Sequence, residues 1–130
     1  MTKKILYILV LAILISCSNQ DSSEVKMVTP EEMTELIEME EVQLVDVRTP
    51  EEHESGFIAH SQNIDFRSPT FEEDIAKLDK SKPVILYCKS GGRSAECGKK
   101  LKEAGFKMVY ELEGGITQWQ FENLEIKTYN

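Results

Sequence analysis

Residues 83–94 read PVILYCKSGGRS, and this run indicates the fold class of the chain. The apolar residues 84–87 predict a buried strand. Cys88 and a glycine-rich turn follow the strand directly, and residues 95–104 predict a helix that ends before Gly105. A buried strand that passes through a tight turn into a helix is the repeating unit of α/β domains.

The rest of the chain repeats this alternation of strand and helix. Residues 29–37 predict a helix with an N-terminal capping box, and residues 42–48 predict a second buried strand. A third strand is predicted at 108–112 and a short helix at 116–121. Apolar strands joined by helices predict a parallel sheet with helices on both faces. A length of 130 residues and a hydrophobic fraction of 41% suit a single domain of this kind.

The turn after the first of these strands has the composition of an anion-binding nucleophile site. Gly91 and Gly92 allow successive N–H groups to point at one spot, and the N-terminus of a helix also favours negative charge. Both effects lower the pKa of a thiol, so Cys88 is the candidate catalytic nucleophile. Arg93 offers a planar fork of donors to an oxyanion.

The other residues of the turn have smaller predicted parts. Lys89 adds positive charge at the rim, and Ser94 is placed to cap the helix that starts there. A buried cysteine before an ordinary turn is the alternative, but it does not explain why cysteine, two glycines and arginine coincide. The predicted substrate-binding residues are Lys89, Ser90, Gly91, Gly92, Arg93 and Ser94.

The length of the turn separates two chemistries. A cysteine in an anion-binding loop can cleave a phosphate ester through a phosphocysteine, or it can carry a sulfane sulfur as a persulfide. Four residues lie between Cys88 and Arg93. This loop is shorter than those of tyrosine phosphatases, and a smaller ring suits one sulfur atom better than a tetrahedral phosphate. The length favours sulfur transfer and leaves a phosphatase or arsenate-reductase relative as the weaker alternative.

Asp46 and Arg48 stand at the end of the strand predicted at 42–48. Residues at the carboxyl end of a central strand lie at the ligand-binding edge of an α/β sheet, so both are candidates for the site. They can equally form a structural ion pair that fixes the following loop. Because most charged pairs do no chemistry, we favour a supporting role for them.

The histidines and the remaining cysteine have simpler interpretations. His53 and His60 lack a cluster of ligands with recognisable spacing, so we predict no metal and no cofactor. Cys97 falls inside the helix after the turn, where a small apolar core residue is the favoured interpretation. The alternative is a resolving thiol that forms a disulfide with Cys88.

Residues 1–16 have the anatomy of an export signal. Lys3 and Lys4 precede an apolar run, 5–15, that is too short to cross a bilayer comfortably as a permanent helix. The sequence LISC at 14–17 resembles the bacterial lipobox, whose cysteine is lipidated. An ordinary signal peptide is the alternative, but the position directly after the apolar run favours lipidation of Cys17.

This anatomy divides the chain into three parts. We predict a lipoprotein signal peptide at 1–16, a polar tether at 17–25 and a folded domain at 26–130, anchored by lipid in the cell envelope. The domain would face the periplasm or the outside of the cell. The net charge of −8 argues against a nucleic-acid partner.

Three blocks of sequence resemble the rhodanese-like domain, over about residues 26–121. Residues 44–53, LVDVRTPEEH, with Gly56 after them, are similar to the family's first signature. Residues 88–94 are similar to the active loop of its single-domain members, and residues 113–119, EGGITQW, to its closing signature.

The resemblance implies a single α/β domain with a five-stranded parallel sheet and helices on both faces. It implies that Cys88 takes sulfur from a small anionic donor, similar to thiosulfate or polysulfide, and passes it to a thiol or to a cyanide-like acceptor. Backbone N–H groups of residues 89–93 would bind the persulfide, Arg93 would orient the donor, and Asp46 and Arg48 would support the site. A non-catalytic or redox sulfur-relay module with the same fold is the alternative function.

One segment departs from the family. Residues 56–61 read GFIAHS, where the family usually has Gly-His-Ile-Pro-Gly-Ala. We therefore expect this loop to follow a longer or differently packed path. The departure leaves the nucleophile in place.

Overall fold

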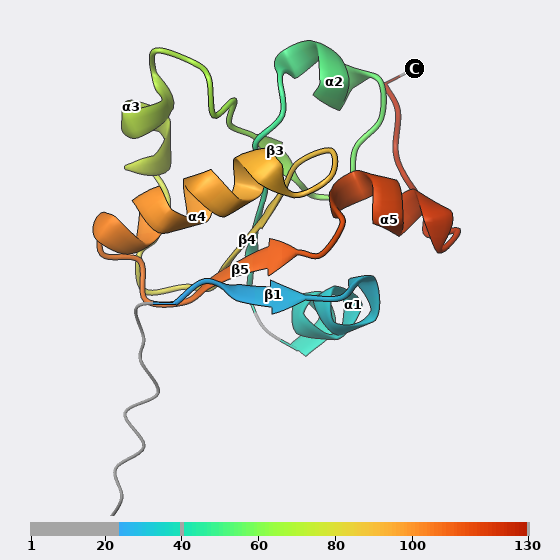
Figure 1. Ribbon diagram of the computed structural model, residues 1–130, viewed down its shortest axis with the longest axis horizontal. Coiled ribbons are helices and arrows are strands. Elements are labelled where there is room, and N and C mark those ends of the chain that lie inside the picture. The colour runs from blue at the N-terminus through green and yellow to red at the C-terminus, as the bar shows by residue number, and fades with distance from the viewer. Residues whose placement is uncertain (1–23, 40, 130) are drawn as a thin grey trace, which may run out of the picture.

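The computed structural model describes residues 24–39 and 41–129 (Figure 1). The predicted signal peptide, the lipidation of Cys17 and most of the polar tether fall outside the described residues. No helix in these two segments has the length and the apolar composition needed to cross a membrane.

The described chain alternates strands with helices. Its five strands are β1 (Lys26–Val28), β2 (Gln43–Asp46), β3 (Gln62–Asn63), β4 (Val84–Tyr87) and β5 (Val109–Leu112). Its five helices are α1 (Pro30–Met39), α2 (Pro50–Glu54), α3 (Phe71–Ile75), α4 (Gly92–Glu103) and α5 (Gly115–Phe121).

The strands form one sheet in the order β1-β5-β4-β2-β3, and every pairing is parallel. β4 is the central strand, with Leu86 paired to Val45 of β2 on one side and to Glu111 of β5 on the other. The predicted fold class is therefore confirmed. Because parallel strands end at the same edge, the loops that follow β2 and β4 lie next to each other.

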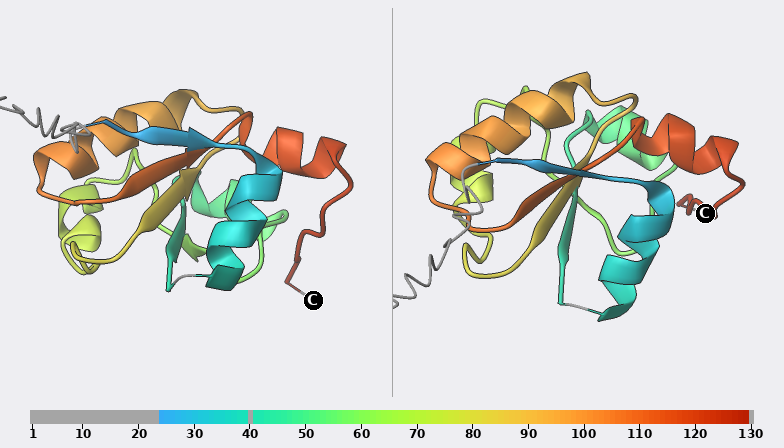
Figure 2. Two further views of the ribbon diagram at one scale, coloured as in Figure 1. Left: turned by 90° about the horizontal axis from the view of Figure 1, so that it is seen from below. Right: turned by 60° about the horizontal axis from the view of Figure 1, so that its bottom comes forward.

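The central position of β4 explains why its residues are apolar on both faces of the sheet. Val84 and Leu86 pack in one core with Leu101 of α4, while Ile85 packs in a second core with Met33 of α1. The two views of Figure 2 show α4 and α1 on opposite sides of the twisted sheet. A strand covered on both faces buries every side chain, which produces a continuous apolar run instead of an alternating one.

Capping residues place the helices largely as the sequence predicts. The Thr29 backbone N–H donates to Glu32 Oε2 at 2.8 Å, and the Glu32 N–H donates to Thr29 Oγ1 at 3.2 Å, which is the predicted capping box of α1. α4 differs from the prediction because it begins at Gly92, two residues before Ser94. Ser94 is therefore not its N-cap, and its hydroxyl is available for other contacts.

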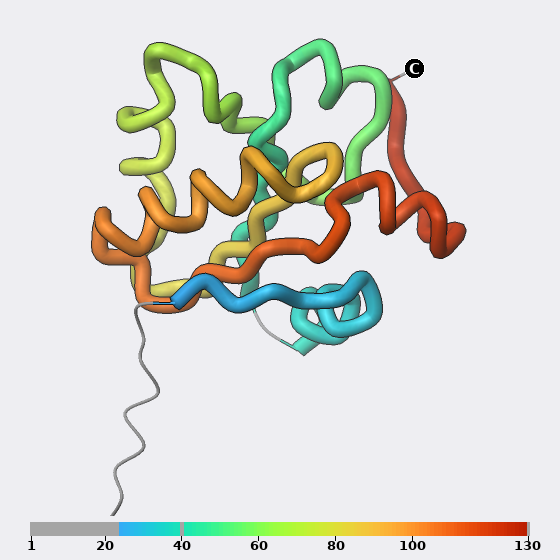
Figure 3. The backbone as a smooth tube through the Cα atoms, in the orientation of Figure 1, coloured from blue at the N-terminus to red at the C-terminus, as the bar shows by residue number. Residues whose placement is uncertain are grey.

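Two peripheral segments were not predicted from the residues. β1 is a short edge strand with little apolar pattern, since Lys26 and Met27 are exposed. The second is the segment after α5, in which Lys127 exchanges backbone hydrogen bonds of 2.9 and 2.7 Å with Phe57 in an antiparallel bridge. Figure 3 shows this last segment rising from α5 beside the loop that follows α2.

Candidate active site

Cys88 lies at the carboxyl end of the central strand, enclosed by the loop that follows it. Only 1% of its surface is exposed. The backbone N–H of Gly91 donates to the Cys88 Sγ at 3.0 Å, and the Ser94 Oγ lies 3.5 Å from the same sulfur. The loop therefore closes around one sulfur atom with donors directed at it.

Gly91 makes this closure possible. Its φ of 122° lies in a region that side-chain-bearing residues rarely adopt, and it is the N-cap of α4. Gly92 has no such requirement, since a Cβ added there would meet no atom within 4 Å. Of the two predicted glycines, Gly91 therefore shapes the loop, while Gly92 lies exposed at its rim with Lys89 and Ser90.

The surroundings of Cys88 stabilise its thiolate. Burial by itself raises the pKa of the thiol, but the Ser94 hydroxyl and the backbone N–H groups of Ser94, Gly91 and Ser90 lower it by more, so that the pKa falls below its ordinary value. The 12-residue helix α4 adds the positive end of its dipole at the same place. A thiol in such a site is ready to act as a nucleophile.

The N-terminus of α5 holds the loop from behind. The N–H of Ile116 donates to the Cys88 carbonyl at 3.0 Å, and the N–H of Thr117 donates to the Lys89 carbonyl at 3.1 Å. Gly115 has a φ of 61°, and a Cβ there would lie 2.5 Å from the Lys89 carbonyl oxygen. Glycine is required at this position because the two backbones touch.

Arg93 is held by a carboxylate from α2. Its Nη1 and Nη2 donate to the two carboxylate oxygens of Glu52 at 2.6 and 2.8 Å. This hydrogen-bonded pairing lowers the pKa of Glu52 to about 2. The sequence predicts Arg93 as an anion ligand, and the ion pair fixes its guanidinium between the loop and α2.

Glu111 is a residue of this site that sequence reasoning missed. It lies on β5, 6% exposed, and its Oε1 accepts a hydrogen bond from the Ser94 hydroxyl at 2.9 Å. The only available sign was an acidic residue inside the strand predicted at 108–112. The register that places Glu111 beside Leu86 of β4, close to the loop, follows from the sheet alone.

Comparison with known proteins shows which family contains this chain. Residues 29–122 match the family described as the rhodanese-like domain. The chain belongs to this family.

Three relatives illustrate the similarity. The chain is 34% identical to the Escherichia coli protein named "Uncharacterized protein YibN" over 91% of its own length and 83% of that protein. It is 34% identical to the thiosulfate sulfurtransferase GlpE of Coxiella burnetii, over 73% of this chain and 87% of that one. The polysulfide-sulfur transferase homodimer of Wolinella succinogenes superimposes with a TM-score of 0.68 at 33% identity, covering 82% and 80% of the two chains.

Asp46 and Arg48 of this rhodanese-like domain form a buried ion pair beside the cysteine loop. Arg48 donates from Nε to Asp46 Oδ1 at 2.9 Å and from Nη2 to Asp46 Oδ2 at 2.6 Å. Its Nη2 also donates to the Gly56 carbonyl, and His53 Nδ1 lies 2.8 Å from Asp46 Oδ2. This network ties α2 and the loop after it to the end of β2.

The loop that departs from the family sequence forms a tight turn. The Ser61 N–H donates to the Ile58 carbonyl at 3.1 Å, and His60 adopts a φ of 67°. His60 thus occupies, at some strain, the left-handed conformation that suits the family's glycine. The Tyr87 hydroxyl accepts the Ile58 N–H at 3.1 Å and lies 2.9 Å from Ser61 Oγ, which anchors the turn to β4.

Cys97 occupies a different environment from Cys88. It is fully buried in the core beneath α4, and burial raises the pKa of its thiol to about 12. Both cysteines are free thiols. A thiol that stays protonated is a poor partner for disulfide exchange, so the packing favours the core role for Cys97.

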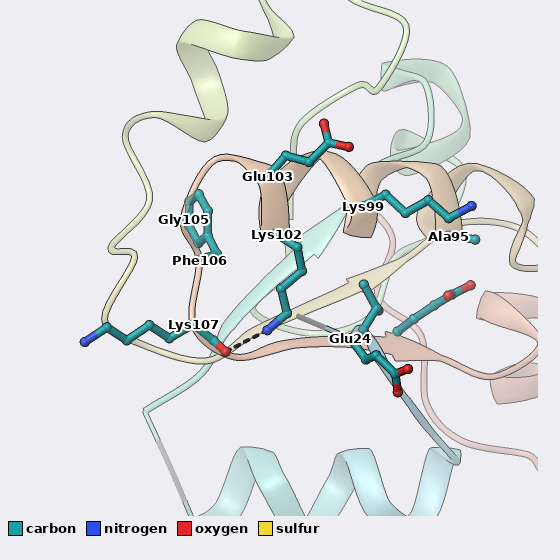
Figure 4. A pocket seen from close by; sticks show the side chains of 10 residues that line it. Glu24, Ala95, Lys99, Lys102, Glu103, Gly105, Phe106 and Lys107 are labelled. Atoms are coloured by element: carbon teal, nitrogen blue, oxygen red, sulfur yellow. Dashed lines mark hydrogen bonds between the residues drawn. The ribbon is translucent and has the colours of Figure 1, made fainter. Parts of the chain in front are cut away.

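A groove of about 960 Å³ runs along α4 on the side toward β1 (Figure 4). Lys99, Lys102 and Glu103 of α4 line it together with Glu111. Lys102 Nζ donates to the Lys107 carbonyl at 2.7 Å across its end. Glu111 therefore borders both this groove and, through its hydrogen bond with Ser94, the loop that follows Cys88. In the described parts of the chain, no three His, Cys, Asp or Glu side chains are grouped so that they could hold a metal ion.

Proposed function

We propose that this rhodanese-like domain is a sulfurtransferase that carries a sulfane sulfur as a persulfide on Cys88. The observation that carries the proposal is the convergence of the Gly91 N–H and the Ser94 hydroxyl on a Cys88 sulfur whose pKa is lowered. The names of two relatives, a thiosulfate sulfurtransferase and a polysulfide-sulfur transferase, support the same chemistry.

The reaction would proceed in two displacements. The Cys88 thiolate attacks the outer sulfur of a thiosulfate-like donor; the donor's S–S bond breaks, and sulfite leaves with the bonding electron pair. The product is Cys88–S–S⁻, whose negative charge the loop donors stabilise. A nucleophilic acceptor such as cyanide then attacks the outer sulfur, and Cys88 leaves as the thiolate. The enzyme returns to its starting state with no net oxidation.

Positive charge at the loop favours an anionic donor. Lys89 is exposed at the rim and supplies this charge, whereas the charge of Arg93 is offset by its ion pair with Glu52. Because the chain as a whole carries a charge of −8, this local positive charge is what would attract a small anion. The loop that follows Cys88 also leads into the N-terminus of α4, which favours negative charge at the same place.

The test is sulfur loading of the full chain. Incubation with thiosulfate should add one sulfur atom to the intact mass and, with cyanide, should yield thiocyanate. Cys88→Ser should lose both, while Cys97→Ala, the matched loss of the other described cysteine, should keep both. Equal thiocyanate from wild type and Cys88→Ser would refute the proposal.

The same experiment separates the alternatives. A folded protein with an accessible Cys88 that takes no sulfur from any small donor would favour a binding or relay module. Hydrolysis of an aryl phosphate that depends on Cys88 would favour a phosphatase relative. The short loop speaks against the second outcome.

We further propose that the domain is anchored in the cell envelope through lipid on Cys17. The LISC sequence after the apolar run at 5–15 supports this. Cys17→Ala should release the protein from the membrane fraction, and mass spectrometry of the wild-type N-terminal peptide should detect the lipid. Unchanged membrane association of Cys17→Ala would contradict the anchor.

A further inference from the structure

Glu111 is a buried carboxylate that the sulfur chemistry described above does not use. Its Oε1 accepts from the Ser94 hydroxyl at 2.9 Å, and a Cβ added to Gly91 would lie 3.5 Å from the same oxygen. The carboxylate thus packs directly under the cysteine loop. Burial raises its pKa above the ordinary value, with the Ser94 hydrogen bond acting in the opposite direction.

The Ser94 hydroxyl has more acceptors around it than it can satisfy. Its Oγ lies 2.9 Å from Glu111 Oε1, 3.1 Å from the Gly91 carbonyl and 3.5 Å from the Cys88 Sγ. A hydroxyl has one hydrogen to donate and two lone pairs with which to accept. An ionised Glu111 accepts only, so it competes with the sulfur for that hydrogen. A protonated Glu111 can donate to Ser94 instead.

We propose that Glu111 is a positioning residue that sets the charge state of Cys88 through Ser94. When Glu111 is protonated, its O–H donates to Ser94 and the Ser94 hydrogen turns to the Cys88 sulfur, where it stabilises the thiolate or the persulfide anion. When Glu111 is ionised, it takes the Ser94 hydrogen and the sulfur loses a donor. The role in sulfur transfer rests on the proposed function, whereas the link to the Cys88 thiol does not.

Glu111 also borders the groove that runs along α4. The sulfur lies on the other side of Ser94. The two groups are coupled through Ser94 and through their like charges. Other charged residues line the same groove and contribute to the field at the carboxylate: Glu24, Lys99, Lys102, Glu103 and Lys107.

The test compares the Cys88 pKa in wild type and Glu111→Gln. The rate of alkylation of Cys88 by iodoacetamide is followed from pH 5 to pH 10, with peptide-resolved mass spectrometry so that other thiols do not contribute. A glutamine side chain is uncharged and can donate its N–H to Ser94, as a protonated Glu111 would. We expect the apparent pKa of Cys88 to fall by about one unit. Glu113→Gln, an exposed neighbour, should leave it unchanged.

A double-mutant cycle with Ser94→Ala identifies the path of the effect. Ser94→Ala should raise the Cys88 pKa, and Glu111→Gln should then shift it by less than half of what it does in the presence of Ser94. An unchanged or raised pKa in Glu111→Gln would overturn the proposal, and so would an equal shift with and without Ser94. If Glu111→Gln fails to fold, the wild-type profile decides: coupling predicts a departure from a single titration, and a single clean step overturns it.

Thiocyanate formation, measured on the same samples, keeps the two proposals apart. A Cys88 pKa that responds to Glu111 in a protein that takes up no sulfur would refute the sulfurtransferase function alone. Normal sulfur transfer together with a Cys88 pKa that does not change in Glu111→Gln would refute the role of Glu111 alone. Where both hold, the thiolate-dependent loading rate below the Cys88 pKa should rise in Glu111→Gln.

Discussion

The loops after β2 and β4 lie side by side at one edge of the sheet, but they differ in how they stabilise negative charge. At the end of β2, Asp46 forms an ion pair with Arg48 and lies 2.8 Å from His53 Nδ1, and all three side chains are buried. After β4, hydrogen-bond donors converge on Cys88, which carries a charge only after it loses a proton. The carboxylate at the end of β2 already has its hydrogen-bond partners, whereas the donors around Cys88 are placed to stabilise a thiolate.

The helices that follow the two loops account for the difference. α2 begins with a capping box in which the Glu52 carboxylate accepts the Thr49 N–H at 2.9 Å, so its N-terminus already has an anion. α4 begins at a glycine N-cap with no side-chain cap. An uncapped helix N-terminus is free to stabilise a charge that appears during a reaction, whereas a capped one only stabilises the fold.

The largest effect is expected from removing the buried ion pair between Asp46 and Arg48. Asp46→Ala leaves a buried Arg48 guanidinium without its carboxylate, and it should cost about 3–5 kcal/mol of unfolding free energy. Urea unfolding followed by circular dichroism measures it. Glu54→Gln, on the exposed face of α2, should change the midpoint little. A loss below about 1 kcal/mol for Asp46→Ala would mean that this network does not stabilise the domain.

A comparable effect is expected where α5 supports the reactive loop. Gly115→Ala adds a methyl group 2.5 Å from the Lys89 carbonyl oxygen and 2.6 Å from that of Cys88, so the loop must move. We expect a loss of about 3 kcal/mol and of most sulfur transfer.

Gly105→Ala is the control for this experiment. It has a φ of 96° and therefore similar backbone strain, but its added Cβ meets no atom within 4 Å. It should cost about 1–2 kcal/mol and retain activity. Equal activity in the two variants would show that the contact with α5 does not shape the loop.

A smaller effect is expected at the second cysteine. Cys97→Ala removes one buried sulfur from the core and should cost about 1 kcal/mol. Alkylation and persulfide formation at Cys88 should be unchanged, because Cys97, with a pKa of about 12, supplies no thiolate near neutral pH. A disulfide between the two cysteines, detected by non-reducing peptide mapping, would contradict this assignment.

The smallest effect is expected at the ion pair between Glu52 of α2 and Arg93 of α4. Glu52 has a folded pKa of about 2 against an ordinary value of 4.5, so the pair with Arg93 stabilises the fold above pH 4.5. This contribution is lost as the pH falls from 4.5 toward 2. The stability difference between wild type and Glu52→Gln should be less than about 1 kcal/mol at pH 7 and should shrink in acid. A difference that grows in acid would reverse the sign of the linkage.

Local patterns predicted most of the fold for identifiable reasons. The apolar run at 84–87 and the capping residue Thr29 act through neighbours in sequence, so β4 and α1 lie close to where they were predicted. β1 was not predicted because an edge strand buries too little to need apolar residues. Ser94 was predicted as an N-cap, but Gly91 holds that position, because its positive φ turns the chain into the helix two residues earlier.

The candidate site divides in the same way. The loop from Cys88 to Ser94 is continuous in sequence, so its composition by itself indicated an anion-binding cysteine. The contacts that hold this loop come from elsewhere in the chain: Glu52 from α2, Glu111 from β5 and the N–H groups at the start of α5. None of them has a fixed spacing from Cys88 that a sequence pattern would display.

The sequence by itself therefore determined the α/β fold class and the loop composition that makes Cys88 the candidate nucleophile, because these depend on hydrophobic periodicity and on residues that are continuous in the chain. Only the tertiary structure decided which groups surround the Ser94 hydroxyl, which residues pair at the end of β2 and which cysteine lies in the core beneath the sheet edge. Hydrogen bonds and desolvation act over a few ångströms, and strand register and helix packing bring distant residues to that range.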